Sequence, residues 1–297
     1  MPLIAAPRRT GTISRVRALS TGTVRIRPEH VASSGTPELW WLMTSRRWTE
    51  PLPINVYVIE HRDGLVLFDA GQDRASVLDP DYFPKALRGI YGRLAHFDIA
   101  EEQTLPRLME RAGYSIGDVR KVVISHLHQD HIGALADLAH AELYVSAAEW
   151  RTLHAPFPEL AGVLRNHIEL PGLRWRHVDL ETSPDSLDPF ASAHDLMGDG
   201  SLVLVPTPGH TPGSMSLLVR DGDATPLFLC GDLTYSCDLL HEGVVPGVGN
   251  AHQLRQTTKL VTGFEQKLGR LEILAAHDPT AAARLGATEF GRGIATG

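Results

Sequence analysis

The seven residues from Ser125 to His131 carry the densest cluster of potential metal ligands in this chain of 297 residues. The stretch reads Ser-His-Leu-His-Gln-Asp-His, and four of its side chains can donate to a metal ion: His126, His128, Asp130 and His131. An apolar segment, Val122 to Ile124, precedes the motif, and a helix-like segment, Ile132 to His140, follows it. A turn between a strand and a helix lets several side chains converge on one point, as a metal site requires.

Three further ligand candidates lie at the ends of expected strands. His210 and Asp232 each come directly after an apolar segment, and His277 ends the last such segment. Glycine or proline stands close to each of them, which permits a sharp turn and a close approach of the backbone. We therefore expect these three side chains to join the motif at one site.

The combined set of five imidazoles and two carboxylates suits two first-row divalent metal ions. A carboxylate can bridge the two cations, and a water bound between them would lose a proton near neutral pH and become a nucleophilic hydroxide. The pattern predicts metal-assisted hydrolysis, with zinc, iron, manganese and cobalt as candidate metals. The chain has 15 histidines, and the ten outside this set are expected on the surface or in loops, among them His154, His167, His177 and His194.

Two more residues have positions that suit a role beside the metals. Asp69 ends an expected strand before Ala70-Gly71, so it is either a turn residue or the partner that orients a ligand histidine. Tyr235 follows Asp232 by three positions and could donate a hydrogen bond to an oxyanion that develops at the site. A tyrosine packed in the loop is the alternative.

Apolar segments with strand character fall into two groups, one in each half of the chain. The expected strands are 12–26 (two strands around a turn at 20–23), 55–60, 65–68, 122–124, 143–145, 201–205, 214–219, 226–230 and 271–275. Helices are expected in both halves, at 105–112, from Ser146 onward and at 251–269. Two sheets packed face to face with helices outside are the layered solution for this order, and the ligands would then meet along one edge.

The remaining segments are expected to be irregular. Residues 1–11 are interpreted as a flexible tail before one domain at 12–297, in which 155–195 form an insertion or lid. A proline-rich loop at 28–53 contains Trp40, Trp41 and Met43, which either fold under as core or line a pocket.

Composition narrows the classes of partner. The formal net charge of −7 argues against a nucleic-acid partner, because phosphate binding needs a concentrated basic face. No apolar run approaches the roughly 18 residues that span a bilayer, and the N-terminus lacks the apolar region of a secretory signal. We therefore expect a cytoplasmic protein without a membrane partner. Two cysteines, Cys230 and Cys237, are too few for a disulfide scaffold.

At this point the motifs resemble the metallo-β-lactamase superfamily: Ser-His126-Leu-His128-Gln-Asp130-His131, Thr-Pro-Gly-His210, Gly-Asp232 and Ala-His277. The resemblance implies an α+β fold, an αββα sandwich of two mixed β-sheets flanked by helices, with a dinuclear site. It implies that His126, His128 and His210 hold one metal. Asp130, His131 and His277 would hold the other, with Asp232 as the bridge and Asp69 in support.

Within the superfamily the chain is most similar to the N-acyl homoserine lactone lactonases, the quorum-quenching branch. The phrases Phe-Asp69-Ala-Gly and Thr-Pro-Gly-His210-Thr-Pro-Gly-Ser carry this likeness, together with the spacing of Asp232 and Tyr235. The resemblance implies that a metal-bridging hydroxide opens the lactone ring, that Tyr235 assists at the carbonyl, and that Asp130 relays a proton. The substrate would carry an apolar acyl chain, for which the candidate pocket residues are Trp40, Trp41, Met43, Phe83 and Tyr91.

Other chemistries share these ligands. A glyoxalase II-like thioesterase and an organophosphate or aryl ester hydrolase stay open, although a glutathione thioester would need a basic recognition patch, which the sequence does not show. A persulfide dioxygenase would use a single iron, and a flavo-diiron protein would need a flavin domain that does not fit after His277. A homodimer is compatible with the sequence, which does not fix the oligomeric state.

Overall fold

A computed structural model describes residues 11–293, so the expected tail lies outside the described residues except for Gly11. Its first sheet has seven strands in the order β4-β1-β2-β3-β5-β6-β7. Their bounds are β1 (Ile13–Ile26), β2 (Leu52–His61), β3 (Gly64–Phe68), β4 (Ala95–Asp98), β5 (Val119–Val123), β6 (Glu142–Ser146) and β7 (Arg174–Val178). The strands β4, β1, β2 and β3 pair antiparallel, whereas β3, β5, β6 and β7 run parallel, so the sheet is mixed.

The second sheet has five strands in the order β12-β11-β10-β9-β8. Their bounds are β8 (His194–Asp195), β9 (Leu202–Pro206), β10 (Met215–Val219), β11 (Leu227–Leu229) and β12 (Glu272–Leu274). All pairs are antiparallel except β11 with β12, which is parallel. Both sheets are therefore mixed, as predicted.

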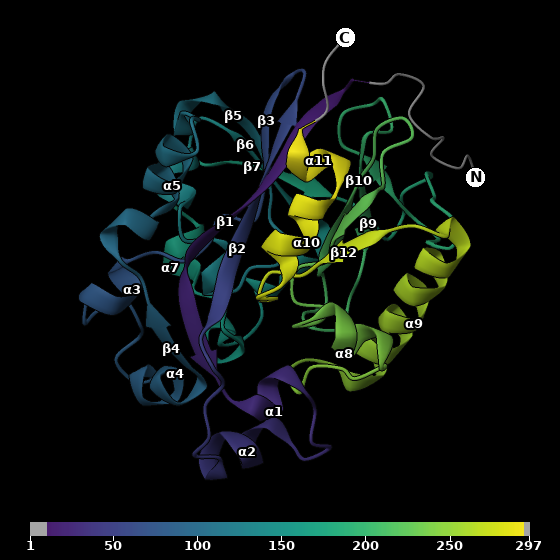
Figure 1. The fold of residues 1–297 in the computed structure, drawn as a ribbon. Coiled ribbons are helices and arrows are strands. Elements are labelled where there is room, and N and C mark those ends of the chain that lie inside the picture. Colours follow the sequence, from purple (N-terminus) through teal and green to yellow (C-terminus); the bar gives the residue numbers. More distant parts are fainter. Residues whose placement is uncertain (1–10, 294–297) are drawn as a thin grey trace.

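Helices cover the outer faces of the two sheets and close one edge between them (Figure 1). The α-helices are α1 (Pro28–Val31), α2 (Glu38–Thr44), α3 (Ala75–Leu78), α4 (Arg88–Leu94), α5 (Leu105–Arg111), α6 (Ala147–Thr152), α7 (Arg165–Ile168), α8 (Cys237–His241), α9 (Ala251–Leu268), α10 (Ala281–Ala287) and α11 (Glu289–Arg292). The 3-10 helices are η1 (Glu101–Gln103), η2 (Ile116–Asp118), η3 (Gln129–His131), η4 (Leu135–Leu138) and η5 (Pro158–Ala161).

The alternation of side chains along β2 shows how the layers are held together. Tyr57 and Ile59 point into the core between the sheets, where they join Leu204 and Leu217 of the second sheet. The intervening residues of β2 point to the opposite face and pack in a cluster that includes Met109 of α5. The outer face of the second sheet packs against α9. This order of helix, sheet, sheet and helix confirms the predicted αββα sandwich.

Several local predictions were wrong. β1 is one continuous strand with an irregularity between Ser20 and Thr23, so the expected turn does not separate two strands. The loop at 28–53 contains the helices α1 and α2, and only short 3-10 turns follow the histidine motif in place of an α-helix. The segment 155–195 is not simply an insertion, because it supplies β7 to the first sheet and β8 to the second.

Among residues 11–293 no helix combines the length and the apolar character needed to cross a bilayer.

Candidate metal centre and its cavity

The structure brings the seven predicted ligand side chains together at one edge of the sandwich. They lie in the loops that follow β5, β9, β11 and β12, which end at this same edge. Three groups have donor atoms within 4.8 Å of one another: His126 with His128 and His210, His126 with His131 and Asp232, and Asp130 with His131 and His277. The first and third groups are the two sets of ligands that the family resemblance implies.

Asp232 lies between these two sets. One carboxylate oxygen, Oδ1, is 3.4 Å from Nε2 of His131 and 3.5 Å from Nε2 of His277. The other oxygen, Oδ2, is 3.5 Å from Nε2 of His210. The carboxylate therefore faces ligands from both groups, as a bridging residue must.

The imidazoles are oriented by the ring nitrogen that points away from the centre. His128 turns Nδ1 inward, 3.0 Å from Nε2 of His210, while its Nε2 donates to the Ala161 carbonyl at 3.0 Å. His277 turns Nε2 inward, while its Nδ1 donates to the Pro53 carbonyl at 2.8 Å. Because the outer nitrogen of each ring carries the proton and donates it to the carbonyl in a hydrogen bond, the inward nitrogen keeps a free lone pair for a metal.

Asp69 performs the same task for His131. Its Oδ2 accepts from Nδ1 of His131 at 2.9 Å, and its Oδ1 accepts from the backbone N–H of Ser125 at 2.7 Å. The Ser125 hydroxyl adds a third bond at 3.0 Å. The Asp69 backbone adopts φ of 64°, a left-handed conformation that Asp tolerates better than most residues. Asp69 is thus the orienting partner and not only a turn residue.

The donor set fits divalent metal ions. Nε2 of His131 and Oδ1 of Asp232 are buried, and neither has a hydrogen-bond partner among the described residues. Unpartnered buried polar atoms are uncommon and costly in folded proteins, so a cation between these two would satisfy both.

The electrostatics of the centre follow from burial and from the two carboxylates near it. Burial, together with the neighbouring His131, lowers the pKa of His126 well below its usual value. Burial would also lower the pKa of His131, but the Asp232 and Asp69 carboxylates raise it instead. Burial opposes ionisation of Asp232, yet His277 and His131 hold the pKa of this carboxyl low. Asp232 is therefore an anion available to cations.

Glu149 is a residue to which the sequence analysis gave no role at the site, because it fits only the local capping pattern Ser-x-x-Glu at the start of α6. The Ser146 hydroxyl does cap α6 by accepting from the Glu149 backbone N–H at 2.9 Å. The fully buried Glu149 carboxylate, however, accepts from the Leu127 N–H at 2.9 Å and from the Thr211 hydroxyl at 2.7 Å. A third bond comes from the Gly213 N–H at 3.1 Å. Glu149 therefore ties the motif loop to the loop that carries His210.

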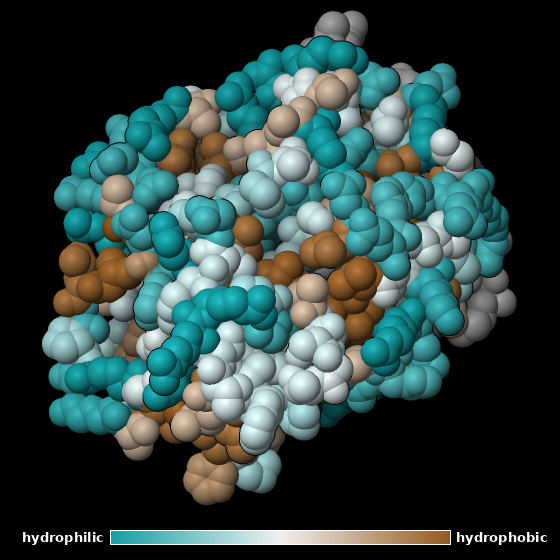
Figure 2. Space-filling model, turned by 60° about the horizontal axis from the view of Figure 1, so that its bottom comes forward, coloured by the Kyte–Doolittle hydropathy of each residue, from teal (hydrophilic) through white to brown (hydrophobic). Residues whose placement is uncertain are grey.

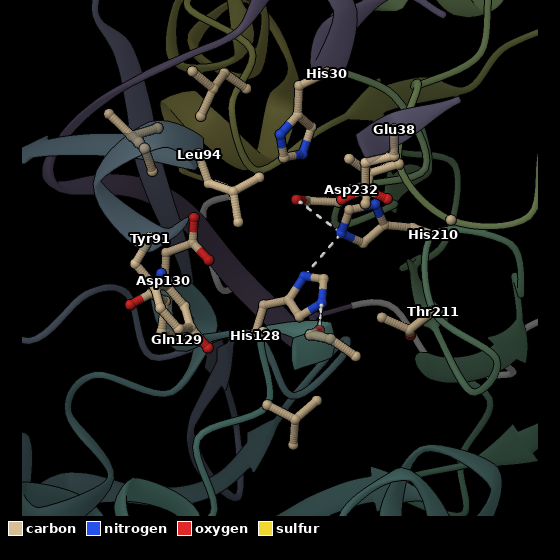
Figure 3. A pocket seen from close by; sticks show the side chains of 18 of the residues that line it. His30, Glu38, Tyr91, Leu94, His128, Gln129, Asp130, His210, Thr211 and Asp232 are labelled. Atoms are coloured by element: carbon tan, nitrogen blue, oxygen red, sulfur yellow. Dashed lines mark hydrogen bonds and ion pairs between the residues drawn. The ribbon is translucent and has the colours of Figure 1, made fainter. Parts of the chain in front are cut away.

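A cavity of about 370 Å³ opens over the metal residues, and its walls come from both halves of the chain. Figure 3 shows His128, His210 and Asp232 converging in this cavity, with His30 on the side opposite His128. The Tyr235 hydroxyl also lies here and donates to Oδ2 of Asp232 at 3.3 Å. Burial and the Asp232 carboxylate raise the pKa of the Tyr235 phenol, so it stays protonated as a donor.

Of the five candidate pocket residues, the structure brings only Tyr91 to this cavity. Trp41 is 2% exposed and packs in the protein, whereas Trp40 and Met43 are 64% and 56% exposed on the outside of α2. Phe83 stacks on Tyr91 at 4.6 Å between ring centroids but does not reach the cavity. Because α2 is a helix, successive side chains point in different directions, and the loop interpretation missed this.

The beginning of the segment 155–195 forms one wall of the cavity. Val163 pairs with His128 through an isolated β-bridge, and Gly162 lies directly over the His128 ring. Gly162 has φ of 81°, and a Cβ there would lie 3.0 Å from Cδ2 of His128. The segment therefore covers the metal residues before it continues into the sheets.

His30 is the second residue that sequence reasoning missed. It belongs to the ten histidines expected on the surface or in loops, but it lines the cavity from α1. No pattern in the sequence distinguishes it, because α1 has only four residues and no periodicity.

The comparisons with known proteins agree with this geometry. The family model of the metallo-beta-lactamase superfamily matches residues 49–270, and the chain belongs to this superfamily, which confirms the predicted resemblance. The N-acyl homoserine lactonase AttM of Rhizobium radiobacter is 30% identical over 236 residues, which cover 77% of this chain and 83% of that protein. A probable metallo-hydrolase of Mycobacterium tuberculosis is 33% identical over 248 residues, covering 76% of this chain and 74% of that protein.

A solved structure shares the fold at lower sequence identity. It is an N-acyl homoserine lactone hydrolase with the product N-hexanoyl-L-homoserine bound at its catalytic metal centre. The TM-score is 0.71 with 21% identity, and the match covers 90% of this chain and 94% of that chain.

Proposed function

We propose that this protein is a metal-dependent hydrolase that opens lactone rings, with N-acyl homoserine lactones as the first candidate substrates. The observation that carries the proposal is the position of Tyr235, whose hydroxyl meets Asp232 in the same cavity as the metal residues. The similarity to AttM supports the same substrate class. Such an activity would remove quorum-sensing signals.

Two divalent ions, zinc first, would be held as the family resemblance implies. His126, His128 and His210 would bind one ion, and Asp130, His131 and His277 the other, with Asp232 between them. When bound, the ions supply Lewis acidity and a water of lowered pKa.

The side chains of this protein would then divide the remaining work. The Tyr235 phenol donates a hydrogen bond to the lactone carbonyl oxygen as negative charge develops on it. Water adds to the carbonyl carbon, the ring C–O bond breaks, and the leaving alkoxide takes a proton. Asp130, which lines the cavity and lies 3.5 Å from Nε2 of His277, would relay that proton.

The charge of the cavity helps to separate the alternatives. The acidic residues of its lining are Glu38, Asp130, Glu149 and Asp232, and no lysine or arginine lines it among the described residues. A glutathione thioester carries carboxylates that such a wall would repel, whereas a lactone is neutral. Aryl esters and phosphotriesters are second candidates, because they too are neutral and would not be repelled by the acidic lining.

A substrate panel with metal analysis tests the proposal. The purified protein is given short- and long-chain acyl homoserine lactones, aryl esters, phosphotriesters and thioesters, and its metal content is measured by elemental analysis. We expect acid release to be fastest with the acyl lactones and about two metal ions for each chain. Faster thioester hydrolysis would reject the lactonase assignment, and a single iron would favour a persulfide dioxygenase.

Four expectations from the sequence stay predictions: the cytoplasmic location, the single domain at 12–297, the homodimer, and the absence of nucleic-acid or membrane partners.

A further inference from the structure

We propose that His30 is a substrate-recognition residue that hydrogen-bonds to the amide group beside the lactone ring. This inference rests on the proposed lactonase function. It extends that function because it concerns the part of the substrate that does not react.

His30 lines the cavity from the helix α1. Its ring points into the cavity opposite His128 (Figure 3). The ring centroid lies 5.6 Å from that of Tyr235 and 6.4 Å from that of His210. A substrate whose carbonyl meets Tyr235 would therefore present its neighbouring groups to His30.

The hydrogen-bonding atoms of His30 also support the proposal. Its Nδ1 atom is buried and has no hydrogen-bond partner among the described residues. Three of the candidate ligand histidines, His128, His131 and His277, each use the outer ring nitrogen in a hydrogen bond to a carbonyl or a carboxylate. A buried nitrogen without a partner is costly, so a polar group of a bound ligand is its natural complement.

The donor and acceptor of the His30 ring indicate the kind of ligand. A neutral imidazole offers one donor and one acceptor, and a secondary amide offers the same pair. An anionic group would find no cationic side chain among the described residues that line this cavity. The complement of His30 is thus a neutral amide.

The experiment compares two lactones in three variants. N-hexanoyl homoserine lactone is tested against an alkyl γ-lactone of equal length that lacks the amide. His30→Phe keeps an aromatic ring against Trp41 and Tyr235 but removes both hydrogen-bonding nitrogens. His30→Gln restores a donor and an acceptor, and His154→Phe, at an exposed histidine, is the control.

With His30→Phe we expect kcat/KM for the amide-containing lactone to fall about 10- to 100-fold, mostly through KM, because a bond to a non-reacting group is lost. The alkyl lactone should lose less than about threefold, His30→Gln should recover most of the loss, and His154→Phe should match the wild type.

Other results have distinct meanings. Equal losses on both lactones would reduce His30 to a packing residue and overturn the inference, as would no loss on either. If His30→Phe does not fold, His30→Met, which fills irregular gaps, takes its place in the same comparison. If the wild-type protein opens neither lactone, the proposed function itself has failed.

Discussion

Two sides of the cavity differ in how firmly their side chains are held. The metal floor consists of the seven candidate ligands, and most of its rings are fixed by a second bond to a carbonyl or carboxylate. The outer wall consists of His30, Glu38, Leu94 and Leu160, which come from the short helices α1, α2, α4 and η5. There Nδ1 of His30 has no hydrogen-bond partner within residues 11–293, and Leu160 is 62% exposed.

The floor and the outer wall therefore contribute differently to catalysis and to substrate selectivity. A floor fixed before the substrate arrives can stabilise a transition state without reorganising. A loosely held wall contributes contacts that depend on the substrate. Figure 2 shows hydrophobic side chains reaching one face of the molecule in separate patches among hydrophilic ones. Floor variants should therefore impair every substrate, and wall variants should change the ranking of substrates.

The largest effect is expected at the centre of the floor. Asp232→Asn removes the charge that faces both ligand groups, so we expect kcat/KM to fall by about 10³-fold or more on every lactone. Metal content measured on the folded variant should fall with it. A variant that kept both ions and the wild-type rate would break the comparison.

A smaller loss is expected when the floor keeps its metals. Tyr235→Phe removes only the phenolic donor, and kcat should fall about 10²- to 10³-fold, as for the loss of one oxyanion donor. Elemental analysis should find unchanged metal content. An unchanged kcat would mean that Tyr235 is a packed loop residue, the alternative that its position alone left open.

Glu149 clamps the two histidine loops together through three hydrogen bonds, so its substitution should weaken metal binding. Glu149→Gln keeps the shape but leaves one acceptor oxygen for the three donors, so the histidine loops loosen. We expect metal affinity to weaken about 10- to 100-fold, measured by competition with a chelator. Glu242→Gln, at an exposed glutamate, is the matched control. Equal affinities in the two variants would show that the clamp does not position the ligands.

The smallest effect belongs to the wall. Leu160→Ala shortens a partly exposed apolar side chain at the cavity, so KM for long acyl chains should rise only about two- to fivefold. The rate with the shortest acyl chain should not change. Steady-state kinetics across a series of acyl-chain lengths measures this change in KM. An equal loss of kcat/KM at all lengths would show that Leu160 affects every substrate alike, as a floor residue does.

The floor was predictable from the sequence because its residues follow strands, and glycine or proline stands close to His210, Asp232 and His277. His126, His210 and Asp232 need only the end of a strand and a turn to reach the edge of the sandwich. The two sheets were predictable for the same reason, since buried strands such as β9 and β10 are continuous apolar runs.

Several features outside the floor were not predictable, because long-range contacts decide them. Glu149 fits a local capping pattern, and nothing in that pattern reveals its bonds to Thr211 and Gly213. Trp40 and Trp41 are adjacent residues of the same type, but the turn of the helix α2 exposes Trp40 and buries Trp41. The edge strand β7 reads Arg-Trp-Arg-His-Val and is largely exposed, so it lacks the apolar run that marked the other strands.

A metal titration measures whether lactone opening depends on the two ions. The protein is stripped with a chelator, Zn²⁺ is added stepwise, and the opening of N-hexanoyl homoserine lactone is followed at each step. We predict negligible activity in the stripped protein and a rate that rises to a plateau near two ions for each chain, as the two ligand groups require. Full activity in the stripped protein would contradict the account, because a metal-dependent lactonase cannot work without its ions.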